Sequence, residues 1–150
     1  MRALIQRVKK ASVIIDGKIF SEIDHGLLIL LGIETEDNHE DINWLTGKIA
    51  RLRIFSDEND AMNLSVNEVA GECLVVSQFT LYASTKKGNR PSFIQAAKPE
   101  TAIPLYEKFI SKLEGETEKT VKTGSFGAMM DIALINDGPV TIWMDSKKRE

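Results

Sequence analysis

The dipeptide Asp16-Gly17 lies between two runs rich in β-branched residues, and it constrains the fold of this chain more than any other feature. Asp-Gly favours the tight two-residue turn whose twist matches that of paired antiparallel strands. Residues 12–20 are therefore predicted to form a β-hairpin. A continuous apolar run at residues 27–31 follows Gly26 and is typical of a strand covered on both faces. Other elements must then pack on the sheet that contains it.

Two segments with helical spacing of apolar residues can supply that cover. In residues 40–52 apolar side chains recur every three or four positions, and Asp37 or Asn38 is placed to cap the start. Residues 99–113 form the second amphipathic helix, in which Pro104 is tolerable because it lies near the first turns.

Most of the remaining chain reads as short strands and turn-rich connections. Further strands are predicted at residues 4–8, 72–78, 118–122, 129–135 and 140–144, and loops at residues 55–70 and 84–97. About seven or eight strands with two helices predict a single α/β (α+β) domain over residues 1–150. Its sheet is expected to be largely antiparallel and barrel-like, with the two main helices packed outside.

Composition and charge exclude several classes of protein. The chain is 43% hydrophobic and 27% charged, which is ordinary for a globular domain. No apolar stretch is long enough to cross a bilayer and no signal peptide is visible. A single cysteine, Cys73, excludes an internal disulfide, so the cytoplasm is the expected compartment. The net charge of −3 argues against a sequence-independent binder of duplex nucleic acid, and no DNA partner is expected.

A small local basic patch remains compatible with an acidic protein. Lys86, Lys87 and Arg90 lie in one predicted loop, and residues 147–149 form a second basic group. Either group is a nucleic-acid contact or solvated surface charge.

The usual catalytic groups are missing from the sequence. His25 and His39 lie in separate loop-like contexts without metal-ligand spacing, and the acidic residues at 34–41 suit the start of a helix. Cys73 lies within an apolar strand, where a small buried hydrophobe is the expected role. We therefore expect no metal and no cofactor, and any hydrolysis must use backbone donors, water or a group of the substrate.

Hydrogen-bonding side chains end the predicted strand at residues 72–78. Ser77, Gln78 and Thr80 place two hydroxyls and an amide directly after β-branched residues. Backbone amides at such a corner can stabilise a developing oxyanion by roughly 2 to 4 kcal/mol per donor. Thr80 is then a nucleophile or a group that positions water. The alternative is that these side chains only satisfy the end of a strand.

Gly138-Pro139 divides the two C-terminal strand predictions. The dipeptide is either a turn between strands or a rigid backbone wedge, since glycine removes side-chain bulk and proline fixes the direction of the chain. A cis bond there, rare even before proline, would indicate a functional geometry.

The segment at residues 77–81, together with that at residues 136–141, resembles the signature pair of the D-aminoacyl-tRNA deacylases, also called D-tyrosyl-tRNA deacylases. The resemblance spans the chain. Blocks similar to those of the family occur in the same order at residues 1–8, 26–28, 87–93 and 124–130.

This resemblance implies a cytoplasmic hydrolase of the ester in D-aminoacyl-tRNA, and of glycine mischarged on tRNA-Ala, that needs no metal or cofactor. It implies a homodimer with its active sites at the subunit interface and the acceptor end of aminoacylated tRNA as its ligand. A non-catalytic nucleic-acid-binding dimer on the same fold remains the alternative.

The resemblance also assigns roles to individual residues. It implies a catalytic corner made of Ser77, Gln78, Phe79 and Thr80. Gly138 and Pro139, joined by a cis bond, would reach into the partner's corner and exclude L-amino acids. Supporting roles are implied for Arg7 at that wedge, for Phe126 and Met129 in the pocket for the terminal adenosine, and for Lys86, Lys87 and Arg90 in tRNA binding.

Overall fold

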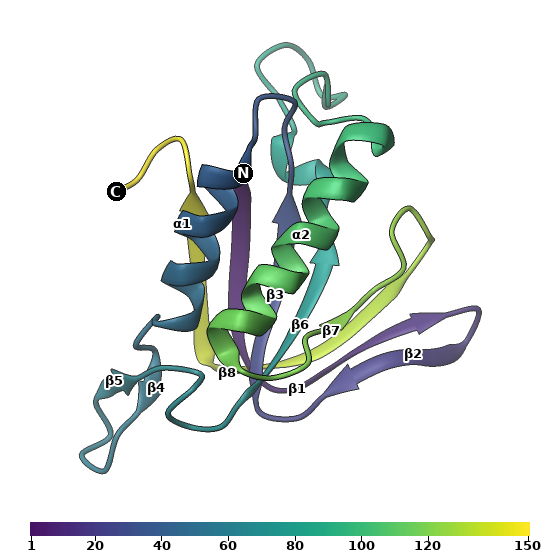
Figure 1. The fold of residues 1–150 in the computed structure, drawn as a ribbon. Helices are drawn as coiled ribbons and strands as arrows, with labels where there is room; N and C mark the ends of the chain where they lie inside the picture. Colours follow the sequence, from purple (N-terminus) through teal and green to yellow (C-terminus); the bar gives the residue numbers. More distant parts are fainter.

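Eight strands and two α-helices make up the computed structural model, which describes all 150 residues (Figure 1). The strands are β1 (Arg2–Ile15), β2 (Lys18–Ile23), β3 (Gly26–Gly32), β4 (Phe55–Ser56), β5 (Met62–Leu64), β6 (Glu72–Ser77), β7 (Lys122–Thr123) and β8 (Asp131–Asp145). The helices are α1 (His39–Ala50) and α2 (Pro99–Thr117), and a 3-10 turn, η1, spans Phe79–Tyr82. No helix is long and apolar enough to span a bilayer.

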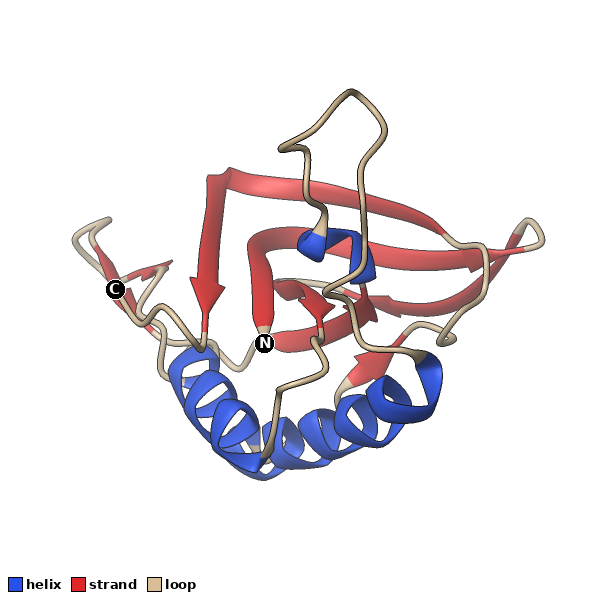
Figure 2. Cartoon of the chain, turned by 90° about the horizontal axis from the view of Figure 1, so that it is seen from above, coloured by secondary structure: helices blue, strands red, loops and turns tan.

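Strand β1 organises the main sheet. It pairs antiparallel with β2, β3 and β8, while β3 pairs parallel with β6 and β6 pairs parallel with β7. The sheet curves until it is nearly closed, and both helices lie on its outside (Figure 2). The predicted α/β fold with a barrel-like sheet and two outer helices is therefore confirmed.

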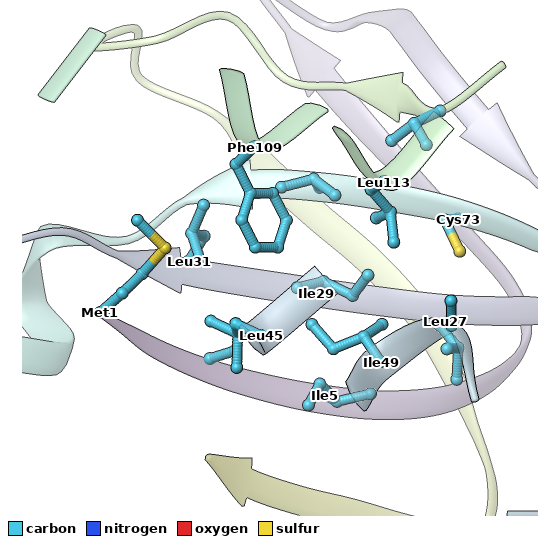
Figure 3. Packing of buried hydrophobic residues seen from close by; sticks show 14 of the residues in the cluster. Met1, Ile5, Leu27, Ile29, Leu31, Leu45, Ile49, Cys73, Phe109 and Leu113 are labelled. Carbon is cyan, nitrogen blue, oxygen red and sulfur yellow. The ribbon is translucent and has the colours of Figure 1, made fainter. Parts of the chain in front are cut away.

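The apolar run in β3 is buried on both faces, as predicted. Its Leu27, Ile29 and Leu31 join side chains from β6 and both helices in the larger core (Figure 3). Leu28, on the opposite face, packs in a second cluster with Val13 from the far half of β1. The second cluster forms because β1 is long enough to bend over the other side of β3 and β6.

The predicted strand at residues 4–8 and the first arm of the predicted hairpin are one continuous strand, β1. The Asp16-Gly17 turn was predicted correctly and has positive φ at both residues. The intervening Lys9 and Lys10 are exposed, but their segment still has a partner because β8 runs alongside β1. The two lysines interrupt the apolar pattern of the sequence, but pairing with β8 keeps this segment extended.

Three other boundaries were predicted wrongly. Residues 55–70 contain the short β4–β5 hairpin rather than only a loop. The strand predicted at residues 118–122 begins only at Lys122, because α2 extends to Thr117 and Glu118 ends it in a left-handed conformation. The strands predicted at residues 129–135 and 140–144 belong to one strand, β8, so Gly138-Pro139 is not a turn between strands.

Asn38 rather than Asp37 caps α1. Its side chain accepts a hydrogen bond from the Glu40 backbone N–H at 2.8 Å, and Asp41 completes a capping box. Asp37 instead lies fully buried against the ammonium group of Met1. The two candidate caps therefore have different roles: Asn38 caps the start of α1, and Asp37 pairs with a buried charge.

A polar network continues from this charge to the end of the chain. The Met1 ammonium donates to the Ser146 hydroxyl at 2.8 Å, and that hydroxyl donates to Asp41 at 2.6 Å. Lys147 donates to the same carboxylate at 2.8 Å. Residues from both ends of the sequence thereby join the start of α1.

The carboxyl groups of Asp41 and Asp145 in this region are expected to make the fold less stable in acid. Burial opposes ionisation of Asp41 and Asp145, but hydrogen bonds outweigh burial and lower the pKa of each below its usual value of 3.8. The donors are Lys147 and Ser146 for Asp41, and the Lys147 backbone and Arg2 for Asp145.

A carboxyl group whose pKa is lower in the folded chain stabilises the fold above its unfolded pKa, and this contribution is lost as pH falls through the folded pKa. We expect the free energy of unfolding, measured in urea, to decrease as pH falls below about 4. Asp41→Asn should flatten that decrease, whereas Glu36→Gln at an exposed site should not. An equal slope in wild type and Asp41→Asn would contradict this assignment.

Candidate active site

The predicted catalytic corner lies at the carboxyl end of β6. There the Gln78 backbone N–H donates to the Leu31 carbonyl at 2.7 Å, and the chain turns into η1. The corner fits closely against the end of β3 because Gly32 has no side chain. A Cβ at Gly32 would lie 3.0 Å from Leu81 Cβ and 3.1 Å from the Gln78 carbonyl oxygen. Gly32 was missed in the sequence, where its only signal is its place at the end of a buried strand.

Hydrogen-bond donors are abundant at this corner, but no base is present. The Gln78 side-chain amide donates to the Thr80 hydroxyl, and no histidine or carboxylate makes a hydrogen bond to Thr80. Phe79 and Thr80 open η1, and the first N–H groups of such a turn have no acceptor within it. The corner can therefore bind an oxyanion or water, but it cannot deprotonate a hydroxyl through a neighbouring side chain.

A small apolar cavity of about 70 Å³ adjoins the corner. Ser77, Phe79 and Phe126 all line it, so the structure brings these three predicted site residues together. Tyr106 holds Phe126 through an edge-to-face contact at 5.7 Å, and its own hydroxyl donates to the Val75 carbonyl at 2.8 Å. The helix α2 thereby positions one wall of the cavity.

Met129 does not line this cavity. Its side chain is 91% exposed, although it lies only three residues after Phe126. Within one chain the structure therefore does not join the two residues expected at the adenosine pocket.

The predicted basic loop begins shortly after η1 and projects from the molecule (Figure 2). Ser84 and Ser92 close it through two backbone hydrogen bonds of 2.8 and 2.9 Å. Lys86, Lys87 and Arg90 are exposed there and form no ion pair, so their charges are free for a ligand. The edge-to-face contact of Phe93 with Phe79, at 5.1 Å, connects the loop to the corner.

Gly138 and Pro139 form an exposed bulge within β8. Asn136 pairs with Val8 and Thr141 pairs with Gln6, so the residues between them have no regular partner on β1. The Gly138-Pro139 bond is cis. The bulge therefore presents main chain to its surroundings rather than to a neighbouring strand.

Arg7 lies directly behind this bulge. Its guanidinium donates to the Asp137 carbonyl at 3.1 Å and to the Ile54 carbonyl at 2.6 Å, and it pairs with the Asp137 carboxylate at 3.3 Å. The side chain thus connects the bulge to the loop before β4. These contacts fit the supporting role expected of Arg7, which stays a prediction.

Within one chain the bulge and the corner lie at opposite ends of the sheet. Arg7 is in register with Leu27 and Leu27 with Cys73, which precedes Ser77 by four residues. At roughly 3.3 Å per strand residue, this offset is about 13 Å along the strands, in addition to the separation across them. Figure 1 shows β8 bending at the end of the sheet opposite the tip of β6. One copy therefore cannot bring its own Gly138 to its own Thr80.

The two histidines lie outside the corner. His39, on α1, contacts Lys108, while His25 lies 3.9 Å from the Asp137 carboxylate beside the bulge. The structure contains no group of three or more histidine, cysteine or acidic residues arranged to hold a metal ion.

Comparison with known proteins places this geometry in a family. The family model described as D-Tyr-tRNA(Tyr) deacylase matches residues 4–145. The D-aminoacyl-tRNA deacylases of Flavobacterium psychrophilum and Akkermansia muciniphila are 64% and 61% identical to this chain, over the full length of both proteins in each case.

Solved structures give the same picture. The c-Myc DNA Unwinding Element Binding Protein superposes with a TM-score of 0.91 at 40% identity, covering 97% of this chain and 98% of that one. A probable eukaryotic D-amino acid tRNA deacylase superposes with a TM-score of 0.81, covering 95% and 97%, and at 15% identity it shows the fold alone. The full-length matches confirm the resemblance read from the sequence: this chain belongs to the D-Tyr-tRNA(Tyr) deacylase family.

Proposed function

We propose that this chain hydrolyses the ester bond between a D-amino acid and the terminal ribose of tRNA, releasing free tRNA and the amino acid. The observation that carries the proposal is the corner at Ser77–Thr80, which supplies hydrogen-bond donors beside a cavity but no base. Its occurrence in a chain that matches deacylases over its whole length supports the assignment.

The chemistry follows from the groups present at the corner. Water attacks the ester carbonyl carbon, the bond to the ribose oxygen breaks, and the proton of the water passes to that leaving oxygen. Backbone N–H groups of η1 would stabilise the intermediate oxyanion, by roughly 2 to 4 kcal/mol per donor. A vicinal ribose hydroxyl can assist the attack, which would compensate for the missing protein base.

Chirality would be tested by the bulge of a second copy. In this proposal the partner's Gly138 and Pro139 enter the corner, and their main chain collides with an L side chain but leaves room for a D side chain. Glycine has no side chain to reject, so glycine mischarged on tRNA-Ala should also be hydrolysed. A site built mainly from main chain suits many different D-amino acids.

Two observations support a homodimer with shared sites. One chain keeps its bulge and its corner apart, so the two can meet only between copies. Met129 and Ile94 are also the most exposed large apolar side chains, at 91% and 89%. Each lies close in sequence to a residue of the corner region, Phe126 or Phe93, where a second copy would cover it.

The tRNA would be bound by its acceptor end alone. Lys86, Lys87 and Arg90 provide unpaired positive charge next to the corner, which explains how an acidic chain can bind RNA. Such a substrate would place the protein in the cytoplasm.

The first test compares D- and L-aminoacyl-tRNA as substrates of the purified protein. We expect rapid hydrolysis of the D-form and background rates for the L-form. Equal background rates would favour the alternative, a nucleic-acid-binding dimer without turnover. One structural relative is named c-Myc DNA Unwinding Element Binding Protein, so DNA is the nucleic acid to test for this alternative. Binding of DNA without hydrolysis of either substrate would support it.

Thr80→Ala separates two roles for the hydroxyl. We expect kcat for D-aminoacyl-tRNA to fall by about tenfold or less, because no neighbouring group can deprotonate Thr80 for nucleophilic attack. Complete loss of activity, together with an acyl-enzyme trapped in the wild type, would instead show a covalent threonine. Thr80→Ser is the matched control, since it retains the hydroxyl.

A further inference from the structure

A second cavity, larger than the one beside the corner, lies at the C-terminal end of β8. It has a volume of about 670 Å³ and lies between β8, α1 and the chain that follows β8. We call it the tail pocket, and the residues that matter here are Arg2, Trp44, Lys48, Trp143, Lys148 and Arg149. Except for the basic group at residues 147–149, none of these was a candidate site residue.

The tail pocket carries excess positive charge on an otherwise acidic protein. Four basic side chains line it against two carboxylates, Asp145 and Glu150. Arg2 is paired with Asp145 at 3.0 Å, and Arg149 with Glu40 at 2.9 Å. Lys48 and Lys148 are exposed and form no ion pair. The Glu150 carboxylate forms no ion pair either, so the unpaired side chains of the pocket carry two positive charges and one negative charge. The remaining excess is cationic and suits an anionic ligand.

Aromatic rings lie among these cations. Trp143 is 50% exposed, and Trp44 lies under the Arg149 guanidinium at 5.1 Å. A cationic groove with an accessible aromatic ring is the combination that binds single-stranded nucleic acid, because bases stack on the ring while lysines contact the phosphates. A protein partner of acidic character would match the lysines but would leave the ring unexplained.

Arg2 connects the tail pocket to the corner. Its guanidinium lies 5.7 Å from the Trp143 ring and 4.3 Å from the Tyr82 ring, and it donates to the Leu81 carbonyl at 2.9 Å. Leu81 and Tyr82 belong to η1, the turn that also carries Thr80. Arg2 therefore joins the tail pocket to the turn that carries Thr80.

We propose that the tail pocket binds the single-stranded RNA that precedes the terminal adenosine, with a base stacked on Trp143 and phosphates near Lys48 and Lys148. The inference rests on the proposed function, because it places the reacting ester at the corner. It adds a second RNA contact to the one expected from the basic loop.

The test uses two substrates that share the reacting ester. D-Aminoacyl-tRNA carries the preceding nucleotides, whereas D-aminoacyl-adenosine lacks them. Lys48→Glu and Trp143→Ala should each raise KM for the tRNA substrate about tenfold, and leave kinetics with aminoacyl-adenosine unchanged. Lys18→Glu is the matched control: Lys18 is exposed and unpaired, and it lies at the tip of the β1–β2 hairpin, far from the C-terminus (Figure 1).

Other outcomes would overturn the inference. Unchanged KM in both variants, an equal loss with both substrates, or an equal effect of Lys18→Glu would each exclude an RNA contact here. If Trp143→Ala converts the protein to monomers in sedimentation, the pocket is instead an interface between copies. Lys48→Glu keeps the test valid if the tryptophan variant does not fold.

Binding of uncharged tRNA separates this inference from the proposed function. A wild type that hydrolyses neither substrate would refute the hydrolase, yet weaker tRNA binding by Lys48→Glu than by Lys18→Glu would still support the pocket. In Lys48→Glu the slope of the logarithm of the binding constant against the logarithm of salt concentration should also decrease by about one unit, because one lysine–phosphate contact is lost. Equal affinities and slopes in the two variants would refute the pocket.

Discussion

Gly138→Ala is expected to lower kcat/KM for D-aminoacyl-tRNA by on the order of a hundredfold, because a small displacement at a reacting site has effects of this size. The new Cβ would lie 2.9 Å from the Arg7 guanidinium and 2.9 Å from the Val140 side chain. Gly138 also has φ +127°, a conformation that alanine rarely adopts. The bulge must therefore shift, and in the proposed dimer it would shift inside the partner's corner.

Gly115→Ala is the control for this change. Gly115 lies in α2 with open space around its Cα, so alanine there should leave activity intact. Unchanged kinetics of a well-folded Gly138→Ala dimer would refute the placement of the bulge at the site.

Mixing two impaired proteins tests whether the bulge acts on the other subunit. Gly138→Ala damages the donor of the bulge, and Gln78→Ala damages the acceptor corner. If the site is shared, re-formed mixed dimers contain one intact site each. An equal mixture should then recover roughly a quarter of wild-type activity, as expected for an interface with two-fold symmetry. Activity no higher than that of either variant alone would place both residues in the same subunit's site.

Asp37→Ala is expected to lower the free energy of unfolding by about 3 to 5 kcal/mol, because it removes the nearest carboxylate from a buried ammonium group. That ammonium would keep only the Ser146 hydroxyl and the Glu34 carboxylate at 3.9 Å. The Asp37 side chain and the Met1 residue are both fully buried, and the carboxylate accepts hydrogen bonds from the Met1 ammonium and from the Glu34 backbone N–H. Urea unfolding at neutral pH measures the loss.

Glu36→Ala is the matched control for Asp37→Ala. Glu36 lies one residue away but is exposed, so its removal should change stability by about 0.5 kcal/mol or less. A loss below about 1 kcal/mol for Asp37→Ala would show that water or another group replaces the carboxylate beside the ammonium.

Local signals in the sequence predicted the elements that depend on short stretches of chain. The Asp16-Gly17 turn, the buried strand β3 and both helices could be predicted, because each is determined by conformational preference and by the spacing of apolar residues within a few turns. The signature segments likewise identified the family correctly. The corner at residues 77–80 was located because polar residues end an apolar strand.

Contacts between distant residues decided the rest. The continuity of β1 and β8 depends on their mutual pairing, which no local pattern reports, and so the bulge at Gly138 was read as a possible turn. Asp37 and Asn38 are equivalent caps in the sequence, and only the Met1 ammonium, folded against one of them, distinguishes their roles.

The tertiary structure also decided which candidate site residues meet. It joins Phe126 to the corner, leaves Met129 exposed, and separates the bulge from the corner of its own chain. Through Arg2 it connects η1 to the tail pocket, whose lining comes from the start of β1, from α1 and from the end of the chain. Distances between side chains depend on how the sheet curves, and that curvature results from packing between elements rather than from the order of residues within any one of them.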